Sequence, residues 1–403
     1  MRILYQRCCG LDVHKESVMA CVLTPEGKQI QKFGTMTKDL LMLSDWLAAF
    51  QVTHVAMEST GVFWQPIYNL LEEEFTVWVV NARHIKNVSG RKTNVKDAEW
   101  IADLLSHGLL SPSFIPGRSQ RELWELVRYR RRLIQNRSQI VNRIQKVLEA
   151  ANIKLDCVAS DIMGASGLAM LRAMAAGETN PDVLADLAKG KLRDKIPFLK
   201  EALRGQIGPH QRFMLSSHLR VLDAITLELE ELDREVATRM GPDEEAIERL
   251  DSIPGVGRRS AEEILAETGT DMSRFPSAAH LASWAKVSPG NNESAGKRQS
   301  GRTGNGNPWI KSALTEAAQA AAKTKDKYFA AQYRRLAPRR GRKRAIAAVA
   351  HSILVTIYYM LRDNVTYQEL GGDYFDARDR LAIVRRAARR IEGLGDKVAL
   401  EPV

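Results

Sequence analysis

Cysteine is scarce in this chain, and the few cysteines present are poorly placed for a zinc site. The four are Cys8, Cys9, Cys21 and Cys157. No pair has the C-x-x-C spacing or the nearby histidines of a structural zinc site, and a disulfide framework has no support either. Residues 1–20 contain no uninterrupted apolar stretch of the kind found in signal peptides. We therefore expect a cytoplasmic protein with free thiols.

The chain also lacks a long apolar run without interruption. The longest apolar stretch, Ala345 to Leu361, is broken by His351, Ser352 and Thr356. It falls short of the roughly 18 clean apolar residues that mark a membrane span. A buried helix is therefore the expected structure of this segment.

Acidic residues are in deficit. Asp and Glu total 48 against 59 Lys and Arg, which gives a net charge of +11. An excess of positive charge on this scale favours a polyanionic partner such as nucleic acid. Hydrophobic residues at 44% and charged residues at 27% exclude disordered, collagenous and membrane-dominated chains. At roughly 100–200 residues per domain, 403 residues indicate two or three domains.

Strand-like and helix-like patterns alternate along the first part of the chain. Between Arg7 and Ile30, apolar and β-branched runs separated by turn residues predict three short antiparallel strands. The elements that follow predict a mixed sheet with flanking helices. They are expected as a helix over 38–50, a strand over 52–57, a helix over 63–73 and a strand over 76–80.

Helical patterns dominate the rest of the chain. Residues 118–151 read as one arginine-rich helix, and apolar residues from Leu215 to Val236 recur at steps of three and four, as in a coiled coil or a helical hairpin. We therefore expect an α/β plus α fold in three domains. These are 1–150 with the mixed sheet and the basic helix, 151–247 with the helical and coiled-coil region, and 248–403, mainly helical with a basic tail.

Three acidic residues lie where predicted strands end or a predicted helix begins. Asp12 closes the first strand, Glu58 closes the strand before Ser59, and Asp97 begins a helix expected to pack beside them. Three carboxylates brought to one point suit Mg²⁺, which leaves further positions for water and phosphate. Such a site supports phosphoryl transfer. The alternative is that each acid is simply solvated at the end of its element.

Two glycine-rich segments in the last domain favour contact with a nucleic-acid backbone. The sequence IPGVG at 253–257 before a helix is typical of a helix-hairpin-helix, although a plain turn between core helices is the alternative. The segment 288–308 is long, basic and rich in small residues, and it contains Ser294. This serine is a candidate nucleophile if a base or metal activates it. Taken alone, the segment is more typical of a flexible phosphate-binding linker.

The helix over 118–151 carries many more bases than acids. A helix this basic repels itself unless phosphate neutralises it, so we expect it to face RNA or the DNA backbone. A solvated helix face is the alternative. With the glycine-rich segments, the candidates for nucleic-acid binding are Arg128, Arg130, Arg131, Arg132, Arg137, Arg143, Gly255, Gly257, Lys297 and Arg298.

Together these segments resemble the transposases of the insertion sequence 110 family, in the subgroup typified by insertion sequence 1111. The resemblance covers nearly the whole chain and implies a RuvC-like, ribonuclease H-like domain with a DEDD set of acids, followed by a transposase domain with an essential serine. It further implies a DNA recombinase guided by a bridge RNA that pairs with donor and target DNA. The motifs that carry it are GLDVHK at 10–15, MESTG at 57–61, residues 92–105, IPGVG at 253–257 and PGNNESAGK at 289–297.

Matched by motif, the first, second and fourth acids fall at Asp12, Glu58 and Asp97, and the essential serine falls at Ser294. The third acid falls at Asn94, where the family usually has Asp, so either this member tolerates Asn or its catalysis is weakened. The resemblance implies that these four positions hold Mg²⁺. It also implies a homo-oligomer, dimer or tetramer, in which the acids of one subunit act with the serine of another.

Two other functions stay open. In a Holliday-junction nuclease of the RuvC type, the same acids activate water and no covalent intermediate forms. A nucleic-acid-binding scaffold without activity would fit Asn94 and the many arginines. The segment around Ser294 favours the recombinase, because a purely hydrolytic enzyme does not need it.

Overall fold

The computed structural model describes most of the chain and divides it into two compact units, Met1–Arg121 and Glu122–Val403. The backbone is described for residues 2–59, 61–81, 94–289, 292–294, 297–300, 303–304, 306–378, 380–395, 397 and 399. Within these ranges the side chains of 94–96, 292–294, 297–300, 381–383, 386 and 387 are not described. The expected first boundary at residue 150 differs from the observed one, because the long basic helix belongs almost entirely to the second unit.

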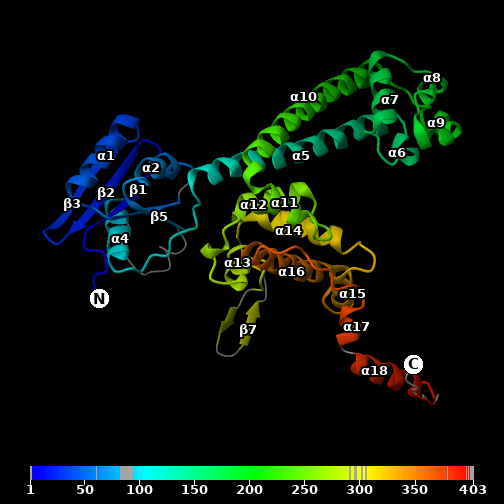
Figure 1. The fold of residues 1–403 in the computed structure, drawn as a ribbon. Helices are drawn as coiled ribbons and strands as arrows, with labels where there is room; N and C mark the ends of the chain where they lie inside the picture. Colours follow the sequence, from blue (N-terminus) through cyan, green and yellow to red (C-terminus); the bar gives the residue numbers. More distant parts are fainter. Residues whose placement is uncertain are drawn as a thin grey trace. The chain divides into compact units, whose positions relative to one another are not determined.

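The first unit is a mixed five-stranded sheet with helices on both faces (Figure 1). The strand order is β3-β2-β1-β4-β5, in which β1–β2 and β2–β3 pair antiparallel while β1–β4 and β4–β5 pair parallel. This confirms the antiparallel start followed by parallel strands. The elements are β1 (Cys8–Val13), β2 (Ser17–Thr24), β3 (Gly27–Gly34), α1 (Thr37–Ala49), β4 (His54–Glu58), α2 (Trp64–Leu71), β5 (Thr76–Val80) and α4 (Asn94–Ser106).

Alternation along the strands sorts the apolar side chains between the two faces of the sheet. Leu11 and Met57 pack with α1 and α2 on one face. Cys8 and Ala56 pack with α4 on the other. Burial raises the pKa of the Cys8 thiol to about 12, so this cysteine serves as a core residue.

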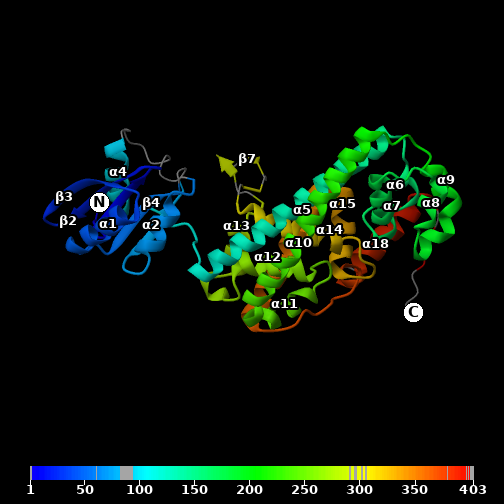
Figure 2. The same cartoon turned by 90° about the horizontal axis from the view of Figure 1, so that it is seen from above.

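The second unit begins with two long helices, α5 (Arg118–Ala150) and α10 (Pro209–Arg239), which lie side by side (Figure 1). Leu133 of α5 packs with Leu229 and Leu232 of α10, whereas the later part of α5 packs with the earlier part of α10, so the two helices run antiparallel. We call the pair α5 and α10 the arm, and small helices pack at its far end (Figure 2). They are α6 (Leu155–Val158), α7 (Ala165–Ala176), α8 (Pro181–Asp186), η1 (Gly190–Lys195) and α9 (Ile196–Ala202).

The apolar residues that recur at near-heptad spacing along α10 are therefore buried against other parts of the same chain. They pack against α5, α7 and the rest of this unit, so of the two predicted structures, coiled coil and helical hairpin, the chain adopts the hairpin. The residues concerned are Leu215, Leu219, Leu222, Leu229, Leu232 and Val236, all buried.

A compact helical body, residues 244–363, follows the arm. It comprises α11 (Glu244–Asp251), α12 (Arg258–Thr268), α13 (Ala278–Trp284), α14 (Pro308–Ala321), α15 (Tyr328–Arg340) and α16 (Arg342–Asp363), with the 3-10 turns η2 (Gly241–Asp243) and η3 (Met272–Arg274). A hairpin of β6 (Asn292–Ser294) and β7 (Lys297–Ser300) extends from the body between α13 and α14. The last two described helices are α17 (Tyr374–Arg378) and α18 (Arg380–Glu392).

The apolar helix α16 lies in the centre of this body. In the part of the chain that the structure describes, it is the one helix with the length and apolar composition of a membrane span. Ile353, Leu354 and Ile357 are nevertheless fully buried against α11–α14. The expectation of a buried helix from 345 to 361 is confirmed for these side chains.

Candidate functional site

The parallel pairing of β1 and β4 brings two of the predicted acids to the same end of the sheet. Leu11 pairs with Met57, and Asp12 and Glu58 are the next residues of their strands. Because side chains alternate between faces, Asp12 and Glu58 lie on the face opposite Leu11 and Met57. That face is the one covered by α4.

Helix α4 carries the third acid to this face at very close range. A Cβ atom at Gly10 would lie 2.3 Å from the carbonyl oxygen of Ala98 and 2.4 Å from the amide nitrogen of Ala102. Only glycine lets the helix backbone approach β1 this closely. Asp97 precedes Ala98 in the first turn of α4, and β1 continues from Gly10 to Asp12.

The electrostatics show that these carboxylates influence each other. Burial raises the pKa of Asp12, whose side chain is only 15% exposed, and the negative charge of Asp97 raises it further. His14 opposes both effects, since its Nε2 lies 3.0 Å from Oδ2 of Asp12. Two carboxyl groups that repel each other at a partly buried position are suited to share a cation.

His14 also belongs to this site, although no role was predicted for it from the sequence. It lies two residues after Asp12 and therefore on the same face, at the point where β1 has just ended. The sequence does contain a signal for this role, because the two-residue spacing of Asp12 and His14 in GLDVHK places both side chains on the same face of an extended segment.

The three acids share a face and an end of the sheet without forming a closed ligand set. Among the residues that the structure describes, no three His, Cys, Asp or Glu side chains come close enough to hold a metal ion. The donor chemistry nevertheless fits Mg²⁺, which prefers a few carboxylates and retains waters. Asn94 begins α4, but its side chain lies outside the described residues.

Ser294 lies in the hairpin of the second unit. It is the last residue of β6 and pairs in register with Lys297, the first residue of β7, while Glu293 pairs with Arg298. The serine and both cations are thus neighbours along the backbone of one short hairpin. Their side chains lie outside the described residues, so the structure leaves their expected roles as predictions.

The chain after this hairpin is anchored by a buried carboxylate. Asn307 caps α14 by accepting a hydrogen bond from the Trp309 amide at 2.9 Å, and its own amide donates to Glu267 of α12. Glu267 is 2% exposed and also accepts two hydrogen bonds of 2.8 Å from Arg128. The Arg128 guanidinium lies over the ring of Trp124, 4.4 Å from its centroid. The end of the serine segment is therefore tied to α5 through Glu267.

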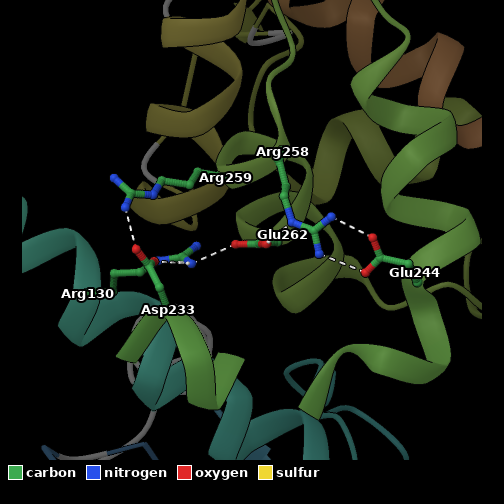
Figure 3. Close-up of polar contacts among 6 residues, drawn as sticks. All are labelled: Arg130, Asp233, Glu244, Arg258, Arg259 and Glu262. Atoms are coloured by element: carbon green, nitrogen blue, oxygen red, sulfur yellow. Dashed lines mark hydrogen bonds and ion pairs between the residues drawn. The ribbon is translucent and has the colours of Figure 1, made fainter. Parts of the chain in front are cut away.

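Two of the predicted nucleic-acid contacts on α5 are structural instead. Arg130 is 1% exposed and donates to Glu262 at 2.6 Å and to Asp233 at 3.2 Å (Figure 3). Arg131 is 7% exposed and pairs with Glu263 and Glu316. This corrects the expectation for Arg130 and Arg131, because carboxylates from distant segments, and not phosphate, balance their charges in this fold.

The same ion-pair network continues around the start of α12. Arg258 donates to both carboxylate oxygens of Glu244 and to Glu262, and Arg259 pairs with Asp233 of α10 (Figure 3). These contacts join α5, α10, α11 and α12 into one charged cluster at the base of the arm. By contrast, Arg132 and Arg143 are exposed and Arg137 is half-buried, which leaves them as candidates for phosphate contact.

The two hairpin glycines between α11 and α12 have different roles. Gly255 has φ +90, and a Cβ atom there would lie 2.4 Å from both the Ala317 carbonyl oxygen and the Ala321 amide nitrogen of α14. Gly255 therefore lets α14 pack closely against this turn, and its role in phosphate contact stays a prediction. Gly257 is the N-cap residue of α12, and a Cβ atom there would meet nothing within 4 Å. The open hairpin surface is at Gly257.

Comparison with known proteins identifies the family. Residues 9–153 match a family model described as a transposase with the label DEDD, and residues 247–334 match one described as "Transposase IS116/IS110/IS902 family". The chain is 26% identical to the transposase for insertion sequence element IS1111A of Coxiella burnetii, over 89% of this chain and 90% of that protein. It is also 27% identical to the putative transposase y4pF/y4sB of Sinorhizobium fredii, over 51% of this chain and 44% of that protein. The chain belongs to the IS110 family of transposases.

Proposed function

We propose that this insertion-sequence transposase is a DNA recombinase that cleaves and rejoins strands in a RuvC-like domain with the help of a serine. The observation that carries the proposal is the placement of Asp12 and Glu58 at adjacent strand ends, on the face where Asp97 raises the pKa of Asp12. Acids gathered at one end of the sheet, in a chain of net charge +11, favour a site that binds a cation and a phosphate.

Asp12, Glu58 and Asp97, with Asn94 as a neutral fourth ligand, would hold Mg²⁺. Bound there, the ion supplies charge neutralisation and polarisation of the scissile phosphate. The contribution of the chain is to keep the carboxylates ionised and oriented. His14 serves that purpose, since its hydrogen bond fixes Oδ2 of Asp12 and lowers the carboxyl pKa against the effect of burial.

Ser294 is the proposed nucleophile. The bond from Oγ to phosphorus forms as the bond from phosphorus to one strand end breaks. The serine hydroxyl gives its proton to water, and the leaving oxygen takes one from water, so that this strand end leaves as a hydroxyl. The phosphodiester bond energy is kept in the protein–DNA bond for rejoining. Lys297 and Arg298, its neighbours in the hairpin register, are proposed to bind the phosphate.

The proposed partners are donor and target DNA, a bridge RNA and further copies of the chain. The helix-hairpin-helix at α11–α12 would contact a backbone through Gly257, and Arg132, Arg137 and Arg143 would meet phosphate along α5. In this proposal the acids of one subunit act with Ser294 of another.

A nicked suicide DNA substrate tests the chemistry. The parent protein should become covalently attached to the DNA through Ser294, and Ser294→Ala should give neither the adduct nor strand exchange. Ser300→Ala, in the same hairpin, is the matched control and should behave as the parent. If Ser294→Ala releases cleaved and unattached DNA at the parental rate, water is the nucleophile and the junction-nuclease function replaces this one.

A further inference from the structure

The turn that joins α15 to α16 is the most basic short segment of the second unit. Residues 334–344, called the basic turn here, have the sequence RRLAPRRGRKR, with seven cations in eleven residues and no acid. Gly341, at φ +80, ends α15 and precedes α16, so cations of both helix ends gather around one turn.

Six of these seven cations are exposed and form no ion pair with a described carboxylate. Arg334, Arg339 and Arg340 are exposed at the end of α15, as are Arg342, Lys343 and Arg344 at the start of α16. Within the part of the chain that the structure describes, no ion pair to a carboxylate is formed by these six. Arg335 differs, because its guanidinium lies 5.3 Å from the ring centroid of Phe375. The contrast with Arg130 and Arg131, which are buried against carboxylates, is clear.

The local fields make this arrangement unfavourable for the free protein. The amino end of a helix carries partial positive charge, so Arg342, Lys343 and Arg344 in the first turn of α16 are repelled by it. They are also repelled by Arg339 and Arg340 across the turn. A run of phosphates on this surface would relieve both repulsions and use the amide groups of the first turn of α16 as well.

We propose that the basic turn binds the sugar-phosphate backbone of duplex DNA. This rests on the proposed function in so far as DNA is the substrate, and it adds a binding surface remote in sequence from the acids and from Ser294. A duplex is favoured over a single strand because single strands bind by stacking bases on aromatic rings, and the basic turn contains none. The contact would hold DNA without reading its sequence.

Fluorescence anisotropy with a 30-base-pair duplex, in EDTA so that no strand is cut, tests the proposal. The variant Arg339→Gln/Arg340→Gln/Arg342→Gln/Lys343→Gln should bind the duplex more weakly. The plot of log association constant against log salt should also become less steep, its negative slope shrinking in magnitude by about 3 to 4, at about 0.9 for each lost phosphate contact. A second variant, Arg339→Lys/Arg340→Lys/Arg342→Lys, should keep the parental slope because it keeps the charges.

The matched control removes four cations that already have carboxylate partners. Lys154, Arg172, Lys200 and Arg204 pair with Glu149, Asp223, Asp182 and Glu201 respectively, so changing these four to Gln alters the net charge equally. This control should keep most of the parental slope.

An unchanged slope in the basic-turn variant overturns the proposal, as does an equal loss in the control. Loss of binding to duplex RNA with duplex DNA binding intact overturns the assignment to DNA. The readout is binding without cleavage, so failure here leaves the Ser294 adduct test unaffected, and the absence of an adduct leaves this binding result unaffected.

Discussion

At the scale of single residues, the position of α4 depends on the missing side chain of Gly10. The backbone of α4 occupies the space that any Cβ atom at this residue would need. Asp97 is carried by the same helix and Asp12 by the same strand. The geometry of the acidic site is therefore fixed by packing two residues away from Asp12.

Gly10→Ala should push α4 away from β1. Overpacking of this kind costs about 1–3 kcal/mol, and we expect a loss of that size in the free energy of unfolding, measured in urea, together with loss of strand cleavage. Gly117→Ala is the control, because a Cβ atom there meets nothing within 4 Å. Parental stability and activity in Gly10→Ala would show that α4 does not approach β1 as described.

The raised pKa of Asp12 predicts a stability cost at neutral pH. A folded-state pKa above the unfolded value of 3.8 means that stability is highest below 3.8 and falls as pH rises through the folded value. Asp12→Asn should therefore unfold at higher urea than the parent at pH 7 without Mg²⁺, and the two should converge well below pH 3.8. Greater stability of the parent at pH 7 would contradict the role of burial.

At the scale of elements, the base of the arm is held by arginines of α5 that meet acids of α12. The Arg130 and Glu262 side chains are 1% and 5% exposed, so water solvates neither charge to any useful extent. Burial raises the pKa of Glu263, and the neighbouring Arg131 opposes this shift. We expect such buried pairs to fix the packing of α5 against α12 and to add little net stability compared with apolar side chains.

Breaking the Arg130–Glu262 pair on one side should be strongly destabilising. Arg130→Met leaves the buried Glu262 carboxylate with only its longer hydrogen bond to Arg258, and it should lower the free energy of unfolding by about 3–5 kcal/mol. The double variant Arg130→Met/Glu262→Met should recover much of that loss, since no unpaired charge remains in the pair. Urea titrations of the parent, of Arg130→Met, of Glu262→Met and of the double variant measure the coupling energy. Additive effects would show that the two residues do not interact.

At the scale of the whole molecule, the acids and the serine belong to different compact units, 1–121 and 122–403. Each unit has its own core, and the function proposed above has the acids of one subunit act with the serine of another. An assembly of that kind has a direct test in mixtures of inactive proteins.

A mixture of Asp12→Ala and Ser294→Ala proteins should recover strand exchange. In a dimer about half of the molecules would be mixed, and each would have one intact composite site of two, so roughly a quarter of the parental cleavage is expected. A mixture of Asp12→Ala with Glu58→Ala is the control and should stay inactive, because no acidic site is whole. Equal inactivity of both mixtures would show that acids and serine act within one chain.

Much of this protein could be determined from its sequence, because the relevant signals are local. Period-two and turn patterns predicted the first three strands, and the long helix over 118–151 is observed as α5. Asp12 and Glu58 could be placed at strand ends for the same reason. The ordered motifs then led to the IS110 family, which the family models support.

The surroundings of the charged residues and glycines in the second unit became known from the packed fold alone. Arg130 meets Glu262 across 132 residues of sequence and Asp233 across 103, distances over which periodicity carries no information. An arginine paired with a distant acid and one free for phosphate look the same in a helical pattern. Gly255 likewise differs from Gly257, because a side chain at Gly255 would collide with α14 and a side chain at Gly257 would not. Which surface is covered is a property of the packed molecule, since it depends on segments that meet only when the chain folds.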